Sequence, residues 1–443
     1  MRQERHEAVK IAQLTPGSGD NFYCENCLRD LGFIKAAGTL GHDVLMVPMY
    51  LPVSVGGEQA DTASPVFFGG INVYLQQKLD FFQRTPRWVD RLFDSPKLLS
   101  WVGRKASMTD ARTLGEMTVS MLRGENGRQA KEMERLAAWL GEAANRPDIV
   151  VLSNALLAGA AGVLKERVGA KVVCLLQDED GFLDGLGEPY ASQAWQLVRQ
   201  RVGDIDGFVA ASGYYADVMR RRLSIDAGKM HVAHAGISLE GCDALRLEPE
   251  APTIGYLSRM CAARGLDTLV EAFVLLKQDP ALSQAKLKIA GGQMPGDAAF
   301  VRGVQKRLAA CGLTADVEFA PDYERSARFA FLRGLSVLSV PEKQPVACGL
   351  YVAEALAVGV PAVQPTGGVF DELSTLTDGG CVTYEPNDAA ILAKRLAALL
   401  KNRERLRELG QAGKEAVFEK FDIRRTAERV MGIYREICNS SAV

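Results

Sequence analysis

The chain has 443 residues, enough for two domains of ordinary size or three small ones, and it is 47% hydrophobic and 24% charged, as is typical of a globular enzyme. A formal net charge of −2 at pH 7 excludes a bulk field that would draw the protein to nucleic acid or to an anionic membrane. No stretch reaches the roughly 18 apolar residues of a transmembrane helix, and residues 1–14 lack the apolar run of a signal peptide, so we expect a cytoplasmic protein.

Short apolar runs alternate with helical patterns through the first half of the chain. Buried strands that are each followed by a helix predict a doubly wound parallel sheet. The residues from about 78 to 145 break this alternation, because they are helical in pattern and rich in Arg, Trp and Phe, and we expect a helical insertion there. The expected strands are AVKIAQL (8–14), DVLMVPMY (43–50), PDIVVLS (147–153), AKVVCLLQD (170–178), IDGFVAAS (205–212) and MHVAHAGI (230–237).

A charged, proline-bearing connector, LRLEPEAP at 245–252, separates this half from a second one. The alternation then restarts with TIGYLSR, LKIAGG, VEFAP, LSVLSVP, PAVQPT and CVTYEP. The sequence therefore predicts an α/β protein of two Rossmann-like domains that face each other across a cleft, which is the default place for a ligand. The expected units are a first domain over 1–245, a second domain over 246–425, and a C-terminal helix over 426–443 that packs back on the first domain.

A lone glutamate, Glu354, stands in an apolar run framed by glycines, PVACGLYVAEALAVGVPAVQP at 345–365. Gly349 opens a helix there, and the free N–H groups of Leu350 and Tyr351 would point into the cleft, where such groups bind phosphate. Glu354 lies one turn further on, where its carboxylate can accept hydrogen bonds from the vicinal hydroxyls of a ribose. The local spacing leaves open a second interpretation, in which Glu354 only interacts favourably with the helix dipole.

Two arginines, Arg259 and Arg264, follow the strand that ends at Leu257. Their guanidinium groups suit a diphosphate, because arginine binds phosphate oxygens in a fork, although two arginines in a solvated loop would have the same local pattern. Two glycine-rich turns also follow strands and would bring the backbone close to a ligand. They are Gly17-Ser18-Gly19 and Gly291-Gly292.

These motifs resemble the family 4 glycosyltransferases of the GT-B fold. The second half is similar to their donor-binding half through TIGYLSRMCAARGLDTLVEAF, LKIAGG, VEFAP, LSVLSVP, CGLYVAEALAVGVPAV and GGVFDEL, and GSGDN with AAGTLGHDVLMVP resembles their acceptor half. The resemblance implies transfer of a sugar from a nucleotide diphosphate sugar with retention of configuration, without a metal or other cofactor. The implied acceptor is a glycan, a lipid-linked sugar or a small molecule, and we expect no nucleic-acid partner.

By position, the resemblance assigns Arg259 and Arg264 to the catalytic neutralisation of the leaving diphosphate, with arginine at 264 where the family has lysine. Glu354 matches the second glutamate of the family's pair, the one that binds ribose. The other positions that we expect near the donor are Gly17, Ser18, Gly19, Gly292, Gly349, Leu350 and Tyr351.

The chain departs from the family's pattern at two places. Val346 stands where the first glutamate of the pair is expected and cannot hydrogen-bond a donor hydroxyl, and Glu342 could replace that glutamate only if the loop bends back. Gln177-Asp178 stands where the family often has a histidine, and we expect these two residues on the acceptor side. The alternative function is therefore a catalytically impaired nucleotide-sugar-binding protein. A third possible function is that of a GT-B sugar-nucleotide epimerase, which would need carboxylates in the cleft that the sequence does not clearly supply.

Three further features have local patterns that fit more than one structure. FYCENC places Cys24 and Cys27 at CxxC spacing, which fits a redox dithiol or half of a zinc site; the sequence has no second CxxC or close Cys/His pair, and we expect both to pack against a strand near the cleft mouth. The segment 80–105 mixes Trp and Phe with Arg and Lys. It fits a lid on the first domain, which we prefer, or peripheral contact with the inner face of a membrane. The acidic stretch 177–188 is expected to be a cleft-facing loop whose acids bind acceptor hydroxyls, or equally a solvated loop.

Overall fold

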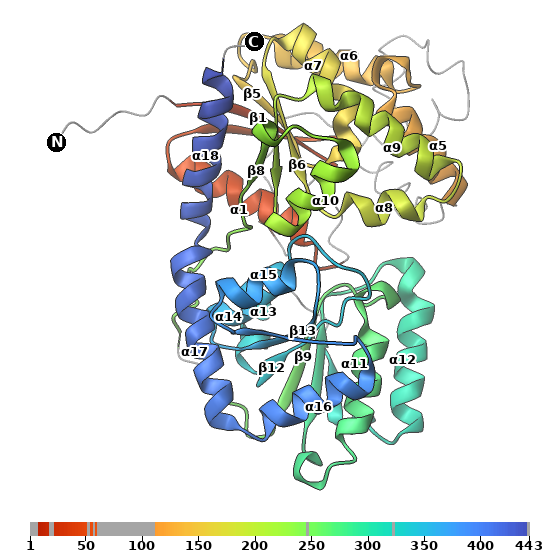
Figure 1. The fold of residues 1–443 in the computed structure, drawn as a ribbon, viewed down its shortest axis with the longest axis vertical. Coiled ribbons are helices and arrows are strands. Elements are labelled where there is room, and N and C mark those ends of the chain that lie inside the picture. Colours follow the sequence, from red (N-terminus) through yellow and green to blue (C-terminus); the bar gives the residue numbers. More distant parts are fainter. Residues whose placement is uncertain are drawn as a thin grey trace, which may run out of the picture.

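The computed structural model describes residues 8–16, 22–50, 54–55, 58–59, 111–244, 248–320 and 324–440. Within these residues, two six-stranded parallel sheets form two lobes, which lie one above the other in Figure 1. The predicted α/β class with two Rossmann-like halves is confirmed by these two sheets. A separate antiparallel pair, β3 (Ser54–Val55) and β4 (Glu58–Gln59), belongs to neither sheet.

The first lobe is built on strands that are covered on both faces. β5 and β7 are completely buried, which explains why they read in the sequence as continuous apolar runs. In sheet order, the strands are β2 (Asp43–Pro48), β1 (Lys10–Thr15), β5 (Ile149–Leu152), β6 (Lys171–Leu176), β7 (Gly207–Ala210) and β8 (Met230–Val232). The α-helices described in this lobe are α1 (Glu25–Thr39), α5 (Ala111–Leu122), α6 (Ala130–Gly141), α7 (Ala161–Val168), α8 (Glu179–Gly185), α9 (Tyr190–Arg201) and α10 (Gly213–Leu223).

The second lobe repeats the arrangement around β9, whose five residues are all buried. In sheet order, the strands are β11 (Val317–Phe319), β10 (Lys286–Ala290), β9 (Thr253–Leu257), β12 (Val337–Leu338), β13 (Ala362–Pro365) and β14 (Cys381–Tyr384). The α-helices around this sheet are α11 (Leu266–Leu276), α12 (Ala298–Ala310), α13 (Arg325–Arg333), α14 (Leu350–Ala357), α15 (Val369–Leu376) and α16 (Ala389–Leu400).

Two long helices, α17 (Arg403–Lys420) and α18 (Ile423–Asn439), run along one side of both lobes (Figure 1). α18 returns to the first lobe, where the Tyr434 ring meets the Phe33 ring of α1 edge to face at 6.0 Å. Its apolar side shares a buried cluster with Ile11 of β1 and Val173 of β6. The last helix of the chain thus completes the core of the first lobe rather than that of the second.

The structure differs from the expected loop at 177–188. Residues 179–185 form helix α8, so that expectation is wrong for this stretch. Of the helical insertion expected over about 78–145, α5 and α6 lie in the described residues, and the part up to residue 110 lies outside them. No helix in the described ranges is both long and apolar enough to cross a bilayer.

Candidate active site between the lobes

The two lobes touch through loops that follow strands of each sheet. Asp178, which follows β6, accepts a hydrogen bond from the Ala347 N–H of the second lobe at 2.5 Å. Tyr23, which follows β1, donates its hydroxyl to Glu354 at 2.9 Å. In parallel sheets, ligands bind at the carboxyl ends of the strands, so this contact region is the candidate site.

Helix α14 begins at Leu350, where the sequence predicts a helix start, because Gly349 holds φ at +67° in the left-handed region. A Cβ atom at this position would lie 3.1 Å from Phe370. Tyr351 is fully buried in the first turn, and its hydroxyl donates to Glu342 Oε1 at 3.1 Å. The local sequence therefore places a fixed helix tip at the cleft.

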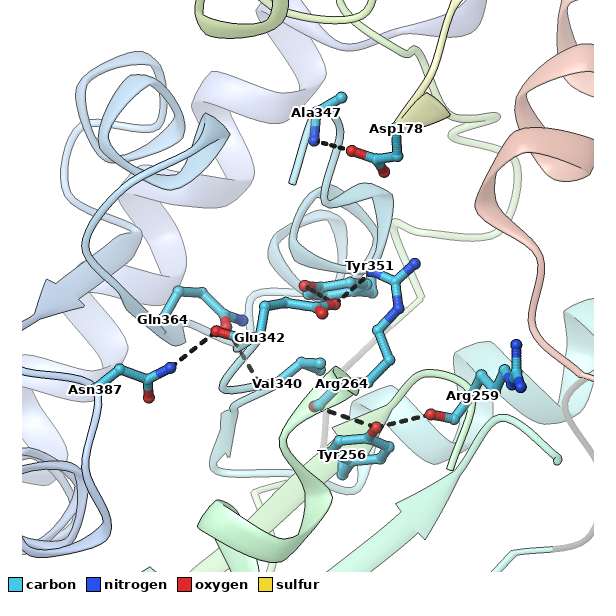
Figure 2. A network of polar contacts seen from close by, with 10 residues as sticks. All are labelled: Asp178, Tyr256, Arg259, Arg264, Val340, Glu342, Ala347, Tyr351, Gln364 and Asn387. Carbon is cyan, nitrogen blue, oxygen red and sulfur yellow. Dashed lines mark hydrogen bonds and ion pairs between the residues drawn. The ribbon is translucent and has the colours of Figure 1, made fainter. Parts of the chain in front are cut away.

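Arg264 lies beside this helix tip (Figure 2). Its Nη1 atom is 2.8 Å from Oε1 of Glu342, which is almost completely buried. The next residue, Gly265, has φ +69°, and a Cβ atom there would lie 1.8 Å from the Pro341 carbonyl oxygen, so only glycine fits this approach. The structure thus brings Arg264 together with the tip of α14, as the sequence predicted for a diphosphate site.

Arg259 belongs to the same loop but has a different partner. Its guanidinium makes a two-point contact with the Asp297 carboxylate, at 2.7 and 3.0 Å. Asp297 also accepts the Met294 N–H at 2.8 Å, in the turn that follows Gly292. The buried Tyr256 hydroxyl holds the loop by donating to the Arg259 carbonyl at 2.9 Å. Arg259 is therefore anchored in the second lobe at the Gly291–Gly292 turn.

Glu354 is buried and has charged and polar partners that the sequence did not indicate. Arg328 of α13 contacts Oε1 through its Nε at 3.1 Å and its Nη2 at 3.0 Å, while Tyr23 occupies Oε2. Glu354 and Arg328 also line a cavity of about 180 Å³ between α1, the chain after β8 and α13. A paired carboxylate at the wall of a cavity remains a suitable acceptor for ribose hydroxyls, provided that Tyr23 moves away.

Residues 22–25, which we call the Phe22–Glu25 segment, reach from the first lobe into the second. Phe22 forms a bridge with Gly292, and the Tyr23 N–H donates to the Gly291 carbonyl at 2.7 Å. The Phe22 ring lies 5.6 Å from the guanidinium carbon of Arg259. Among the groups expected to bind the donor, the segment therefore covers Gly292, approaches Arg259 and engages Glu354.

The carboxylate of Glu25, at the end of this segment, lies where a phosphate is expected. Burial raises the pKa of Glu25 to about 8, while the charge of Arg264 and a hydrogen bond from the Leu350 N–H oppose the shift. Burial likewise raises the pKa of Glu342 to about 7, against the opposing effect of Arg264. Burial alone would lower the pKa of Arg264, but Glu342, Glu25 and Asp178 outweigh it and hold that pKa well above its ordinary value. Arg264 is thus a permanent cation among three acids.

The side chains of the two residues expected on the acceptor side, Gln177 and Asp178, lie in different places. The Gln177 side chain is buried, its Nε2 donates to the Ser153 carbonyl, and its Oε1 has no hydrogen-bond partner among the described residues. Asp178 has φ +58° and faces the second lobe, and burial raises its pKa. The structure therefore directs Asp178 toward the cleft, whereas Gln177 lies within the first lobe near Asp30.

The position that lacks the expected glutamate is packed as a core residue. Val346 is buried, and its carbonyl accepts the Val369 N–H at 3.0 Å. Glu342 is held by Arg264 and Tyr351, both through Oε1, so its carboxylate orients the arginine.

Gly17, Ser18, Gly19 and the 80–105 segment lie outside the described residues. Within the described ranges, no group of three or more His, Cys, Asp or Glu side chains is arranged to hold a metal ion.

The fold is shared with solved glycosyltransferase structures. Sucrose-phosphate synthase from Thermosynechococcus elongatus superposes with a TM-score of 0.68 at 18% identity, covering 98% of this chain and 100% of that one. The Anabaena protein HepE, solved in complex with UDP-glucose, superposes with a TM-score of 0.63 at 14% identity, covering 97% of this chain and 100% of that one. Residues 103–240 match the family model described as Glycosyltransferase Family 4, and residues 243–416 match Glycosyl transferases group 1.

The chain belongs to the family 4-like glycosyltransferases of the GT-B fold.

Two relatives of known name are similar to this glycosyltransferase over part of their sequences. Alpha-maltose-1-phosphate synthase of Mycolicibacterium smegmatis is 26% identical over 273 residues, which cover 57% of this chain and 68% of that protein. Glycogen synthase of Rhodospirillum rubrum is 27% identical over 298 residues, which cover 62% of this chain and 52% of that protein. The similarity therefore spans between about half and two thirds of the length of these relatives.

Proposed function

We propose that this glycosyltransferase moves a sugar from a nucleotide diphosphate sugar to an acceptor hydroxyl with retention of configuration and without a metal ion. The observation that carries the proposal is the position of Arg264 beside the tip of α14. A fixed cation and the N–H groups of a helix start at one point stabilise the charge that develops on a leaving diphosphate. Such stabilisation replaces the role of a divalent cation at the phosphates.

The proposed chemistry needs no protein base. The leaving phosphate oxygen takes the proton of the acceptor hydroxyl on the face from which the sugar bond breaks, so the new bond forms with the configuration of the old one. Val346 contributes nothing to this step, because its side chain is apolar and buried. Asp178 is the described side chain of the first lobe that we assign to the acceptor.

The decisive experiment is a transfer assay with UDP-glucose, the donor named with the Anabaena structure, and with the GDP, ADP and dTDP sugars. Acceptors would include glucose 1-phosphate, because the α-maltose 1-phosphate named with the Mycolicibacterium smegmatis relative is glucose 1-phosphate with one added glucosyl group, and a glycogen primer, after the name of the Rhodospirillum rubrum relative. We expect an α-linked product from an α-linked donor, read by the anomeric proton coupling, and undiminished activity in EDTA. A β-linked product or loss of activity in EDTA would contradict the proposal.

Arg264→Ala tests the group that carries the proposal. Removal of one fixed donor to a developing charge lowers transfer by about 10²–10³-fold. The matched control is Arg307→Ala, because Arg307 pairs with Glu271 on the exposed surface of the same lobe. Transfer by Arg264→Ala at the rate of the control would remove the catalytic assignment.

A nucleotide-sugar-binding protein without turnover is the second candidate. It is favoured by one observation, the buried Val346 at the position where the family's pair has a glutamate. The two functions are separated by calorimetry with UDP beside the transfer assay. Nucleotide binding with neither transfer nor donor hydrolysis, across the whole donor and acceptor panel, favours the second candidate.

A further inference from the structure

Two cysteine thiols face each other at the start of helix α1. Cys24 is the residue before the first turn of the helix, Cys27 lies within that turn, and their sulfur atoms are 2.9 Å apart. Neither cysteine is in a disulfide bond. Cys27 is buried with Leu31 and Met46, whereas Cys24 is partly exposed. Cys24 is therefore the more exposed residue of the pair, and its sulfur lies in contact with that of Cys27.

The surroundings of Cys24 favour its thiolate. A hydrogen bond with the Cys27 thiol lowers the pKa of Cys24, and the N–H groups of Cys27 and Asn26 lower it further. Burial and the charge of Asp30 act in the opposite direction, but the net shift of the pKa is downward. A partly exposed cysteine whose thiol pKa is lowered at a helix N-terminus, with a second cysteine three residues on, is the arrangement of redox-active dithiols. By contrast, burial raises the pKa of the core cysteines Cys174 and Cys381.

A zinc site at these sulfurs would need four ligands. The described part of the chain brings no third His, Cys, Asp or Glu side chain to them in a metal-binding group. The pair therefore has the chemistry of a dithiol.

The position of the dithiol connects it to the donor site. Cys24 stands between Tyr23, which donates to Glu354 at 2.9 Å, and Glu25, whose buried carboxyl has its pKa influenced by Arg264 and by the Leu350 N–H. These contacts use the groups that we assign to the ribose and to the distal phosphate. Any change at Cys24 thus acts on the residues that cover the donor site.

We propose that Cys24 and Cys27 form a redox switch, in which oxidation to a disulfide holds the Phe22–Glu25 segment in the donor site and hinders nucleotide binding. The effect on nucleotide binding rests on the proposed function. The dithiol itself is independent of it.

The oxidant is a low-molecular-weight disulfide. The Cys24 thiolate attacks one sulfur of the oxidant, a mixed disulfide forms, and the first oxidant thiolate leaves. The Cys27 thiol then loses its proton and attacks the Cys24 sulfur, which releases the second oxidant thiolate. Two protein thiols are oxidised by two electrons, and one oxidant disulfide is reduced to two thiols.

The cross-link acts on access to the donor site because the sulfurs are already close while the segment covers that site. A disulfide forms with a small movement and fixes the start of α1 in this conformation, whereas the dithiol form can release Tyr23 and Glu25. By reciprocity, bound nucleotide must oppose disulfide formation by the same factor by which the disulfide opposes nucleotide binding.

The first experiment equilibrates the full chain in glutathione buffers of increasing oxidised fraction, followed by alkylation and peptide mass spectrometry. We expect an intramolecular disulfide between Cys24 and Cys27, and faster alkylation of Cys24 than of the partly exposed Cys311 in the reduced protein. Saturating UDP is expected to shift the titration toward the dithiol. Glutathione adducts without the internal disulfide, or a bound zinc ion that blocks alkylation, would overturn the proposal.

The second experiment compares UDP affinity by calorimetry in the reduced and oxidised protein. We expect at least a tenfold weaker affinity after oxidation, reversed by dithiothreitol, and no response to oxidant in the Cys24→Ser/Cys27→Ser variant, whose folding is checked by circular dichroism. Cys311→Ser is the matched control and is expected to respond as the wild type does. Equal affinities in the two redox states would overturn the switch. A reduced protein that binds no nucleotide would instead contradict the proposed function. The mass spectrometry would still show whether Cys24 and Cys27 form a disulfide.

Discussion

Arg264 depends on its neighbours to act at the leaving group. Glu342 holds it at 2.8 Å, and Tyr351 in turn holds Glu342. The acid therefore has two opposing effects on a bound diphosphate, since it orients the cation that the diphosphate needs and adds a negative charge nearby. A substitution can separate these effects.

We expect Glu342→Gln to bind UDP as tightly as the wild type or more tightly, yet to transfer sugar about tenfold more slowly. The binding step loses a repulsive charge, while the chemical step loses the orientation of Arg264. The measurement is UDP affinity by calorimetry beside kcat from transfer assays, with the exposed Glu318→Gln as control. A parallel fall in UDP affinity and kcat, together with a lower Tm, would indicate a merely structural role.

Glu25 and Glu342 both have raised pKa values, of about 8 and about 7, and a substitution separates the contribution of Glu25 to the pH dependence of the site. The folded Glu25 pKa of about 8 lies above the unfolded value, so folding stability from this group is full below the unfolded pKa and is lost as pH rises through about 8. Ionisation also places a negative charge at the expected phosphate position. We expect UDP affinity to fall between pH 7 and pH 9 in the wild type and much less in Glu25→Gln.

The control for this experiment is the Tm of both proteins at pH 6 and pH 9. Glu25→Gln should gain Tm relative to the wild type at pH 9 and show little difference at pH 6. Identical pH profiles of UDP affinity for the two proteins would contradict the assignment of the titration to Glu25.

At the scale of elements, the tip of α14 depends on Gly349. An alanine there meets two costs, the left-handed φ of +67° and a Cβ contact of 3.1 Å with Phe370. We expect Gly349→Ala to lose about 1–2 kcal/mol of stability and several-fold in UDP affinity, because the Leu350 N–H shifts with the backbone. Chemical denaturation and calorimetry measure the two effects.

Gly359 provides the matched control at the other end of the same helix. It has φ +77°, but an added Cβ would meet no atom within 4 Å. Gly359→Ala should therefore lose stability through the backbone conformation alone and keep the wild-type UDP affinity. Equal losses of UDP affinity in both variants would show that the tip of α14 does not hold phosphate.

The sequence predicted helices and strands correctly where the residues of one element alone determine its pattern of apolar residues and glycines. β5 and β9 are buried on both faces and therefore read as short apolar runs, and Gly349 and Gly359 bracket α14 as expected. The expectation was wrong for α8, because acidic residues at 179–180 in its first turn favour a helix start as well as a loop.

The partners of the site residues could not be predicted in the same way. Tyr23 and Glu354 are 331 positions apart, and Arg328 reaches Glu354 from a helix whose own pattern is only amphipathic. Such contacts depend on how two lobes meet, which no local spacing encodes. Arg264 and α14 were predictable as neighbours because both follow strands of one parallel sheet.

At the scale of the whole molecule, one carboxylate joins the two lobes through the start of α10. Glu372 of α15 accepts the Gly213 and Tyr214 N–H groups at the start of α10, each at 3.1 Å, and contacts His234 Nε2 at 2.5 Å. It thereby satisfies two of the free N–H groups that every helix start presents. Burial would raise the pKa of Glu372, but His234 and the two N–H groups outweigh it and lower that pKa. Its contribution is present above the unfolded pKa and is lost as pH falls through the folded value.

We expect Glu372→Ala to favour an open arrangement of the lobes. Loss of charge-assisted hydrogen bonds costs about 2 kcal/mol, which is roughly thirtyfold in the ratio of closed to open forms. The larger radius of gyration is measured by small-angle X-ray scattering, and the donor KM should rise while each lobe keeps its stability. The adjacent Asp371→Ala is the control, because Asp371 accepts the Gly367 N–H within its own lobe. If both variants scatter as the wild type does and keep its donor KM, the contact made by Glu372 does not hold the lobes together.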